Sequence, residues 1–563
     1  MKIYLVAWCT LFVVMGIQST ALGKSTPQDQ TALTPRAIWK KTAGVFSGDI
    51  FILPKKGNFL LGEKDFSVSR LLPSTVKGKT IPPHPITMHG VAWDYDLRIP
   101  IAFFDPSNQW IKPNQYRNMA TQQDIASTMS HILNIPAPAR NPGRVLFEAL
   151  RVNPKLKLPR AILVFVQDQA GVEYYKAHPG AAPFYEKIMK SGANFVNASV
   201  SHVDVETSVG HMAVGSGAWP SEHGVSGNNF FHLGMWQQIK AFTIPISASK
   251  KENLVGNPSL FFTPTVADIW VTATSGKAKV FSQVYAPRAA IGMAGHGATF
   301  IHGLKTHVVW MDESDNHGES YMTDERIYSL PNSHRGKSVR SFAESLTKET
   351  SGRWKGHSLF TPDGKLDGDM VKASPALSDF EGTIAVEAIK ELQIGTDDVT
   401  DLVFINTKAT DACGHRFGFE SDECGEVLTA SDSAAKKIFD QIHLQSSGEF
   451  IAILTADHGA APLPEVSGKT RFSFDALTKD LNTKFDRRDN QIDVIKALTS
   501  SQIYVNEAEL AASGFKLEDM VKFLKSYKVT LTSKYNSLAD EWIKRGTPKE
   551  QLFFEDVVIS DSL

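Results

Sequence analysis

Residues 451–464, IAILTADHGAAPLP, decide how the rest of the chain is interpreted. They begin with a short apolar run, which is typical of a buried strand in a parallel sheet. They then place a carboxylate and an imidazole side by side, at Asp457 and His458, before a glycine. Ligands of open α/β sheets gather at the carboxyl ends of strands, and Asp with neutral His suits a divalent metal, zinc above all. Alone, this motif is more often a turn, so further ligands must come from elsewhere.

Length and composition exclude several classes of protein. The chain has 563 residues, enough for one large α/β domain with an insertion or for two or three domains. Its formal net charge is −1 and 21% of its residues are charged, which leaves no electrostatic footprint for nucleic acid or an anionic membrane. A hydrophobic content of 42% is ordinary for a globular protein.

Residues 1–23 have the pattern of a secretory signal peptide. Lys2 precedes an apolar run over residues 3–17, and small residues follow at Ala21 and Gly23. The alternative is an uncleaved membrane anchor, but the run is short for a spanning helix. No later stretch is long and apolar enough to span. We therefore expect an exported protein, periplasmic or secreted, with no membrane span after cleavage.

The chain contains three cysteines, of which Cys9 leaves with the signal peptide. Cys413 and Cys424 remain and lie close together in the sequence. In an exported protein such a pair can form a disulfide. The alternative is two free thiols, one of them near the predicted metal site.

From residue 159 onward, predicted strands alternate with predicted helices. This alternation indicates an α/β fold with a doubly wound, mostly parallel sheet. The elements that define it are strands at 161–166, 401–406 and 451–454 and helices at 184–190, 378–392 and 430–442. Residues 230–371 break the rhythm and are rich in Gly, Ser, Trp and Tyr, so we expect them to form an inserted cap over the site.

Three of the predicted strands end in an aspartate. Asp168 follows the first, Asp411 follows the second with His415 four residues later, and Asp457 and His458 end the third. Each position alone could be a helix cap or a turn residue, which is the default for Asp after a strand. Together they offer carboxylate oxygens and imidazole nitrogens at one edge of a sheet, nearly enough for two metals.

A fourth motif occupies residues 206–231, ETSVGHMAVGSGAWPSEHGVSGNNFF. Thr207 lies just before a predicted helix, near the positive end of the helix dipole. Coordination to a metal would lower the pKa of its hydroxyl and make it a nucleophile. The alternative for Thr207 is a helix N-cap, which the local sequence alone favours.

Taken together, these motifs resemble the alkaline phosphatase superfamily. The resemblance is to its threonine-nucleophile branch, the phosphate-irrepressible phosphomonoesterases and, further off, the nucleotide pyrophosphatase/phosphodiesterases. The matching patterns are Thr207-x-x-Gly210-His211, Gly217-x-x-Pro220-x-x-His223-Gly224-Val225-x-x-Asn228, Asp168-Gln169, Asp411-x-x-x-His415-x-Phe417-Gly418 and Thr455-Ala456-Asp457-His458-Gly459. They cover most of residues 159–464.

The resemblance implies two Zn²⁺ ions, or other divalent metals, and a small phosphoester substrate. The first metal would be held by Asp168, Asp457, His458 and the Thr207 oxygen. The second would be held by Asp411, His415 and one further histidine. Asn228 would donate a hydrogen bond to a phosphoryl oxygen, while His211 and His223 would be structural.

The family places the further histidine downstream of the Asp-His-Gly motif, but no histidine follows His458 here. One alternative is a crippled second site in an inactive protein. The other is supply from upstream, because MHGVAWDYDLRIPI at residues 88–101 resembles the family's final segment and offers His89. We therefore predict a circular permutation, with residues 24–158 as the permuted C-terminal part and 159–563 as the phosphatase core. The alternative for His89 is a solvated loop histidine.

The chain departs from the monoesterase pattern at the phosphate contacts. In that branch a Lys-x-Arg pair touches the phosphate. Here YAPRAA at residues 285–290 places Arg288 at the arginine and Ala286 at the lysine. A monoester dianion carries more charge than a diester, so the loss of one cation should cost monoester transition states more. The alternative for Arg288 is a surface arginine.

We therefore predict an exported, metal-dependent phosphohydrolase that cleaves phosphate monoesters through a phospho-threonine intermediate. The missing lysine favours an alternative, a phosphodiesterase or nucleotide pyrophosphatase on the same two-metal site. A third alternative, from a different class, is a catalytically inactive exported binding protein on the same fold.

Overall fold

The structure is a computed structural model, and it describes residues 34–44, 47–151, 157–232, 237–247, 252–297, 304–312 and 318–562. The predicted signal peptide lies outside these residues. Within them, no helix combines the length and the apolar character that crossing a membrane requires.

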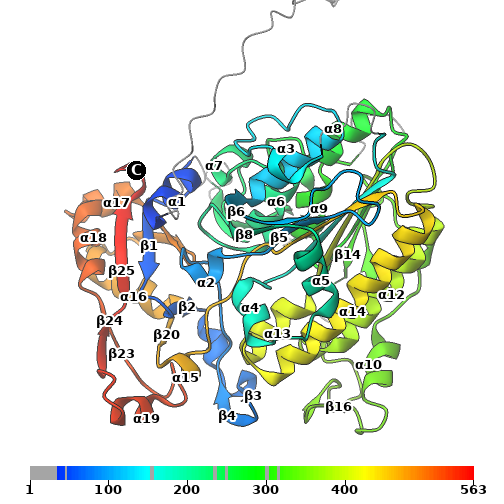
Figure 1. The fold of residues 1–563 in the computed structure, drawn as a ribbon. Coiled ribbons are helices and arrows are strands. Elements are labelled where there is room, and N and C mark those ends of the chain that lie inside the picture. The colour runs from blue at the N-terminus through cyan, green and yellow to red at the C-terminus, as the bar shows by residue number, and fades with distance from the viewer. Residues whose placement is uncertain are drawn as a thin grey trace, which may run out of the picture. The chain divides into compact units, whose positions relative to one another are not determined.

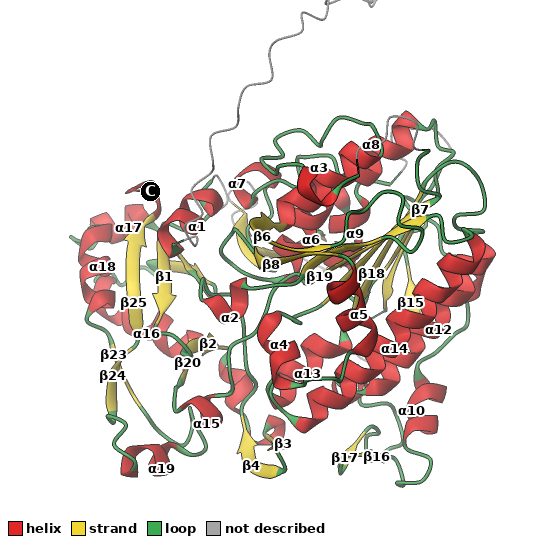
Figure 2. Ribbon diagram, viewed as in Figure 1, coloured by secondary structure: helices red, strands yellow, loops and turns green. Residues whose placement is uncertain are grey.

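A nine-stranded mixed sheet forms the centre of the fold (Figure 2). In spatial order its strands are β15 (Tyr321–Met322), β14 (His307–Met311), β13 (Val280–Gln283), β18 (Asp401–Thr407), β7 (Ala161–Gln167), β19 (Phe450–Thr455), β5 (Ile101–Phe104), β8 (Ala193–Ser199) and β6 (Asn114–Thr121). The five from β14 to β19 run parallel, whereas β5 is antiparallel to both of its neighbours and β15 to its single neighbour. The predicted α/β class with a mostly parallel sheet is confirmed.

Helices cover both faces of this sheet (Figure 1). One face carries α3 (Gln122–Ile132), α6 (Thr207–Ser216), α8 (Val266–Ala273) and α9 (Pro287–Ala294). The other carries α5 (Pro183–Ser191), α12 (Pro375–Glu391), α13 (Ala409–Phe417) and α14 (Asp422–Gln445). A strand covered on both faces buries all of its side chains, which is why β7, β18 and β19 are continuous apolar runs in the sequence. Cys413 on α13 and Cys424 on α14 form a disulfide, the first of the two alternatives for this pair.

Helix α6 lies unusually close to the end of β19. A Cβ atom added at Gly210 would be 2.6 Å from the backbone oxygen of Asp457, so only glycine allows this approach. Because Gly210 lies one turn after Thr207, the close contact brings the first turn of α6 to the carboxyl edge of the sheet.

Residues 230–371 differ from the predicted cap. They contribute β13, β14 and β15 to the central sheet, and α8 and α9 to its cover. The rest of the segment forms short elements, including β9 (Asn229–His232), β10 (Gln237–Lys240), β11 (Thr243–Ser247), β12 (Glu252–Val255), α10 (Arg340–Leu346), β16 (Arg353–Trp354), β17 (His357–Ser358) and α11 (Gly368–Lys372). The strands VFSQ and HVVWM are too short to show a period against a background rich in glycine and aromatic residues.

The N-terminal part of the chain is interleaved with the C-terminal part (Figure 1). β1 (Ile50–Pro54) pairs with β25 (Phe554–Ile559) and β22 (Gln502–Val505), and β21 (Ile495–Leu498) completes this four-stranded sheet. β2 (Phe59–Leu61) pairs with β20 (Arg471–Ser473). Around them lie α1 (Pro35–Thr42), the hairpin β3 (Leu72–Val76) and β4 (Lys79–His84), α2 (Asp94–Leu97), α15 (Pro464–Ser467), α16 (Phe474–Phe485), α17 (Glu507–Ala512), α18 (Leu517–Lys525), β23 (Lys528–Thr530), α19 (Ala539–Lys544) and β24 (Glu550–Leu552). The permutation and the boundary at residue 158 stay predictions.

A buried ion pair ties the segment around residue 86 to the loop that follows β19. Arg471 and Glu465 are fully buried and share two hydrogen bonds, Nη1 to Oε1 at 2.8 Å and Nη2 to Oε2 at 2.9 Å. Arg471 Nε also donates to the backbone oxygen of Ile86 at 2.8 Å, three residues before His89. The pair therefore helps to hold the His89 loop against the core.

We expect Arg471→Met to lower the free energy of unfolding by about 3–5 kcal/mol, because it leaves the Glu465 carboxylate buried without its partner. Urea unfolding followed by circular dichroism measures this loss. Arg545→Met is the matched control, since it removes an exposed pair with Glu541 and should cost about 0–1 kcal/mol. A loss from Arg471→Met no larger than that of the control would contradict the prediction.

Candidate metal centre

Three neighbouring parallel strands end level at one edge of the central sheet. Asn406 of β18 and Thr455 of β19 both pair with Val166 of β7, so the three strand ends are in register. Asp168 follows β7 directly, while Asp411 and Asp457 follow the other two strands within a few residues. Since side chains beyond the carboxyl ends of parallel strands meet in one crevice, the three aspartates converge there.

The first cluster consists of Asp168, Asp457 and His458, all fully buried. His458 Nε2 lies 3.2 Å from Asp457 Oδ2 and 3.8 Å from Asp168 Oδ1. These three atoms are buried and have no hydrogen-bond partner among the described residues. A buried polar atom without a partner costs about 1–3 kcal/mol, so these three atoms favour an added ligand. Asp168 and His458 also form, with Asp411, one of the groups that could hold a metal ion, and Asp168 and Asp457 form another with His211. Two carboxylate oxygens and one imidazole nitrogen fit a zinc-type ion.

The electrostatics of this cluster also favour an added cation. Burial and the charge of Asp457 raise the pKa of Asp168 to about 8. Burial acts to raise the pKa of Asp457 as well, but the charge on His458 outweighs it and holds that pKa below its usual range. Burial would lower the pKa of His458, yet Asp457 raises it to about 9. A divalent cation would replace the proton on His458 and allow both carboxylates to ionise.

The second cluster consists of His89, Asp411 and His415. Asp411 Oδ1 lies 3.2 Å from His415 Nε2 and 3.7 Å from His89 Nε2. The His89 ring also stacks on the His458 ring, with centroids 3.7 Å apart, so the two clusters adjoin. His89 is only 4% exposed, which excludes the solvated loop alternative. These three side chains form one of the groups that could hold a metal ion.

The three histidines of the two clusters are oriented in the same way. Each ring pairs its Nδ1 with a backbone oxygen, of Val205 for His89 at 2.7 Å, Thr87 for His415 at 2.7 Å and Gly459 for His458 at 2.9 Å. A carbonyl accepts only from an N–H, so each ring carries a proton on Nδ1 and turns its Nε2 toward the carboxylates. This is the arrangement that outer hydrogen bonds impose on metal-binding histidines.

The loop that carries His89 is held by Asp96 and by a glycine conformation. Asp96 Oδ2 accepts hydrogen bonds from the backbone N–H groups of Gly90 at 3.0 Å and Val91 at 2.9 Å. Burial raises the pKa of Asp96 to about 8. Gly90 has φ of +115°, a conformation that glycine adopts without strain. These contacts fix the backbone next to His89 and so orient its side chain.

His211 and His223 lie outside the proposed ligand set. His211 is near Asp168 and Asp457, but its Nδ1 pairs with the backbone oxygen of Thr207 at 2.7 Å and its Nε2 with Asn406 Nδ2 at 2.9 Å. Both ring nitrogens are therefore used within the protein. His223 Nδ1 accepts from the Val225 N–H at 3.1 Å. These contacts agree with the structural role predicted for both.

A cavity of about 290 Å³ opens over the second cluster and is lined by His89, Thr207, Asn228, Arg288, Lys408 and Asp411, among others. Thr207 is the first residue of α6, and Glu206 is its N-cap, so the N-cap alternative for Thr207 is wrong. The Ser208 N–H donates to Asn228 Oδ1 at 2.9 Å, which holds that side chain at the start of the same helix. Arg288 lies in the first turn of α9, and its Nε is buried without a hydrogen-bond partner among the described residues.

The structure thus brings together all nine residues predicted for the site. They are His89, Asp168, Thr207, Asn228, Arg288, Asp411, His415, Asp457 and His458. Their individual roles stay predictions.

Two residues contact the centre in ways that the sequence motifs did not predict, Lys408 and Gln169. Lys408 Nζ lies 2.6 Å from Asp411 Oδ2, 3.1 Å from Asp168 Oδ2 and 3.5 Å from Thr207 Oγ1. Gln169 donates from its backbone N–H to Asp457 Oδ1 and from Nε2 to Asp411 Oδ1, both at 3.0 Å. Both could have been found from their positions in the sequence. Each lies within a few residues of a predicted strand end that is followed by a candidate metal ligand.

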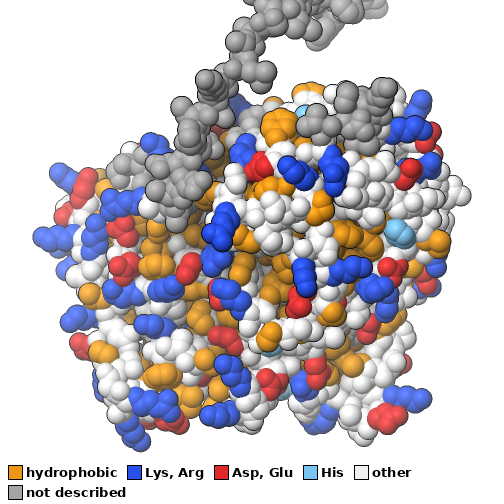
Figure 3. All heavy atoms as spheres, in the orientation of Figure 1, with side chains coloured by type: hydrophobic (Ala, Val, Ile, Leu, Met, Phe, Trp, Pro, Cys, Tyr) orange, Lys and Arg blue, Asp and Glu red, His pale blue; other side chains and the backbone are white. Residues whose placement is uncertain are grey.

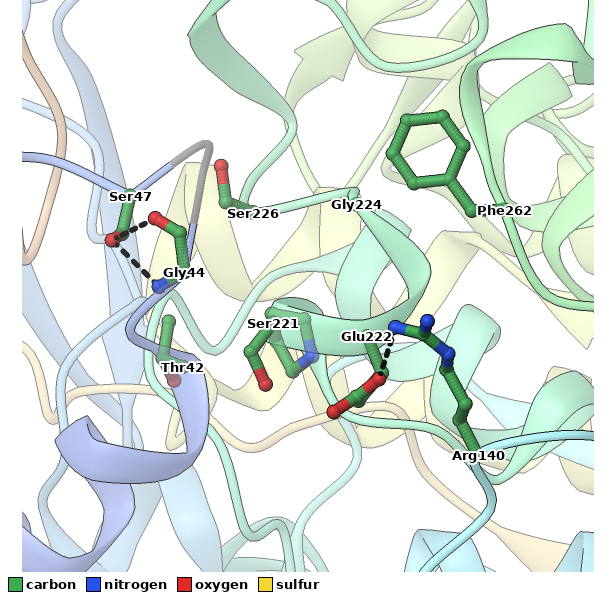
Figure 4. Close-up of a pocket in the computed structure, with 10 residues that line it drawn as sticks. Thr42, Gly44, Ser47, Arg140, Ser221, Glu222, Gly224, Ser226 and Phe262 are labelled. Atoms are coloured by element: carbon green, nitrogen blue, oxygen red, sulfur yellow. Dashed lines mark hydrogen bonds and ion pairs between the residues drawn. The ribbon is translucent and has the colours of Figure 1, made fainter.

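A second cavity, of about 270 Å³, lies beside α7 (Pro220–His223) and is drawn in Figure 4. Its charged side chains, Arg140 and Glu222, pair with each other at 2.9 Å. Ser47 Oγ donates to the backbone oxygen of Gly44 at 2.7 Å. In the described part of the chain, the groups that could hold a metal ion consist only of residues of the two clusters and His211.

The surface of the molecule carries both signs of charge. On the face shown in Figure 3, Lys and Arg side chains are interspersed with Asp and Glu. This agrees with the formal net charge of −1.

Fold and site together define an α/β protein with two adjoining clusters of buried histidine and aspartate at the carboxyl edge of a mostly parallel sheet. The chain belongs to the family of type I phosphodiesterases / nucleotide pyrophosphatases, whose model matches residues 162–553. That family implies a phosphoester as the substrate.

The chain is also similar to curated relatives and to solved structures. Alkaline phosphatase PafA of Elizabethkingia meningoseptica is 24% identical over 402 residues, which cover 64% of this chain and 72% of that protein. A calcium-transporting ATPase of Myroides odoratus is 22% identical over 416 residues, which cover 66% and 74%. The crystal structure of wild-type alkaline phosphatase PafA matches with a TM-score of 0.54 at 20% identity, over 72% of this chain and 85% of that one. At this identity the structural likeness shows the fold alone.

Proposed function

We propose that this protein is an exported phosphohydrolase that cleaves phosphate monoesters with Thr207 as the nucleophile. The observation that carries the proposal is the cluster of Asp168 Oδ1, Asp457 Oδ2 and His458 Nε2. These buried atoms have no hydrogen-bond partner among the described residues, and both carboxylate oxygens lie within 3.8 Å of the imidazole nitrogen. Export is supported by the pattern of residues 1–23 and by the disulfide.

Two divalent ions, zinc in the first instance, would be held by the two clusters. Asp168, Asp457, His458 and Thr207 would hold one, and His89, Asp411 and His415 the other. When bound, the ions supply positive charge that lowers the pKa of a hydroxyl and stabilises the negative oxygens of phosphoryl transfer.

The residues of the chain carry out the remaining steps of the reaction. Thr207 Oγ1 forms a bond to phosphorus while the bond from phosphorus to the ester oxygen breaks, and the departing alcohol gains a proton in place of the one that Thr207 loses. Water then attacks phosphorus, releases phosphate and returns a proton to Thr207. The positive end of the α6 dipole favours negative charge at this oxygen. The Asn228 amide and the Arg288 guanidinium bind the non-bridging phosphoryl oxygens, where charge accumulates in the transition state.

The circular permutation is also proposed. It is supported by three observations: the position of His89 in the second cluster, the pairing of β1 with β25, and a family match that begins only at residue 162. In this arrangement, residues 24–158 supply the part that other members carry at the C-terminal end.

The experiment is an assay of the purified, zinc-loaded protein on p-nitrophenyl phosphate and bis-p-nitrophenyl phosphate. We expect a higher kcat/KM for the monoester, and loss of activity on chelation. A preference for the diester would instead favour the phosphodiesterase alternative, which Ala286 at the expected lysine position supports. Hydrolysis of neither ester would favour the inactive binding protein.

A further inference from the structure

The ammonium group of Lys408 lies between the two clusters. It binds the carboxylate oxygens of Asp168 and Asp411 that do not face the histidines. Asp411 turns Oδ1 toward His415 and His89, and its Oδ2 accepts from Lys408 at 2.6 Å. Asp168 turns Oδ1 toward His458, and its Oδ2 accepts from Lys408 at 3.1 Å. Each aspartate therefore serves a cluster with one oxygen and the lysine with the other. The lysine and both metal ions can be bound at the same time.

The same ammonium group points at the proposed nucleophile. An ammonium has three N–H donors, and two of them are used by Asp168 and Asp411. Lys408 Nζ lies 3.5 Å from Thr207 Oγ1, so the third N–H is directed toward this hydroxyl. An oxygen of a phosphoryl group on Thr207 falls within hydrogen-bond reach of this third N–H. The Lys408 side chain is only 7% exposed, so water screens such a contact weakly.

We propose that Lys408 is the second phosphate-binding cation of this site. It supplies, from the end of β18, the positive charge that Ala286 at the start of α9 cannot. The inference rests on the proposed function and refines its substrate class. With Lys408 and Arg288 both facing the phosphoryl group, the site carries the charge that a monoester dianion needs. The competing role is a structural counter-ion that only neutralises Asp168 and Asp411.

The test compares Lys408→Met, which keeps the length of the side chain and removes its charge, with the wild type. We expect kcat/KM for p-nitrophenyl phosphate to fall about 10²–10³-fold, the effect of removing one donor to a transition-state oxyanion. For bis-p-nitrophenyl phosphate we expect a fall of about 10-fold or less, because a diester carries less charge. Inorganic phosphate, used as a competitive inhibitor or titrated in a calorimeter, should bind at least about 10-fold more weakly. Zinc content by mass spectrometry should stay at the wild-type value.

Lys372→Met is the matched control, because Lys372 lines the same cavity but lies over the ring of Tyr285, 5.0 Å from its centroid. It should change the ratio of the two kcat/KM values by less than about 3-fold, as expected for a cation that is more exposed to solvent and therefore more screened. If Lys408→Met does not fold, Lys408→Gln replaces it, since an amide can still donate to one aspartate.

The outcomes separate this inference from the proposed function. An equal fall for both esters, with unchanged phosphate affinity, or a loss of zinc from Lys408→Met, would make Lys408 a counter-ion and overturn the inference alone. Hydrolysis of neither ester by the wild type would overturn the proposed function, and phosphate titration of the two proteins would still decide the role of Lys408. A wild type that binds no phosphate would overturn the inference.

Discussion

Thr207→Ala will lower the turnover of p-nitrophenyl phosphate at least about 10³-fold, the scale on which enzymes lose activity with their nucleophile. The physical reason is that Thr207 Oγ1 is the proposed nucleophile, and alanine has no oxygen that could form the bond to phosphorus. The variant should fold, because Glu206 is the N-cap of α6 and the contact of the Thr207 hydroxyl with Lys408 is long, at 3.5 Å. Steady-state kinetics on the zinc-loaded protein measures the loss, and thermal unfolding checks the fold.

Ser208→Ala is the control for Thr207→Ala, because it removes the adjacent hydroxyl, which is buried and has no hydrogen-bond partner among the described residues. It should change turnover by less than about 10-fold, since the Ser208 contact to Asn228 uses its backbone N–H. Acid quenching during turnover should trap phosphate on Thr207 in the wild type and not in Thr207→Ala. Equal turnover by Thr207→Ala and the wild type would remove Thr207 from the mechanism.

His89→Ala will reduce the bound zinc from two equivalents to one. It removes one of three side chains of the second cluster, and we expect the affinity of that site to fall by more than about 100-fold, beyond the effect of losing an outer partner. The first cluster keeps Asp168, Asp457 and His458 and should stay loaded. Metal analysis after dialysis at fixed free zinc measures the change without reference to activity.

His84→Ala provides the comparison for His89→Ala. His84 is equally buried, at the end of β4, but it is held by Ser74 at 3.0 Å and by the Pro85 oxygen at 2.9 Å. It should destabilise the protein without changing its zinc content. Two equivalents of zinc in His89→Ala would disprove the assignment of His89 and remove the main support for the permutation.

The parts of the fold that could be predicted are those in which function and burial leave a local pattern. The strands predicted at 161–166, 401–406 and 451–454 agree within one residue with β7, β18 and β19. They could be found because a strand covered on both faces is a continuous apolar run. The aspartates that follow them needed no tertiary information, since parallel strands place their ends at one edge.

The parts that could not be predicted depend on residues distant in the sequence. β13 and β14 lie in the segment that was expected to form the cap. Strands of four or five residues are too short to be recognised from the sequence, and they are seen to belong to the central sheet only because β13 pairs with β18 and β14 with β13. The N-cap of α6 was placed one residue late, because a cap is defined by backbone angles and not by residue type. Lys408 lies two residues after the end of the strand predicted at 401–406, yet a lysine there is usually an exposed strand end.

By itself, the sequence determined the α/β class, the three central strands and the set of side chains able to bind metal, because each depends on residue type and short spacing. Only the tertiary structure decided that His89 lies 3.7 Å from Asp411, and that each histidine keeps its proton on Nδ1. It also decided that Lys408 shares Asp168 and Asp411 with the two clusters. These features are distances between side chains on separate elements, and only the packing of those elements sets them.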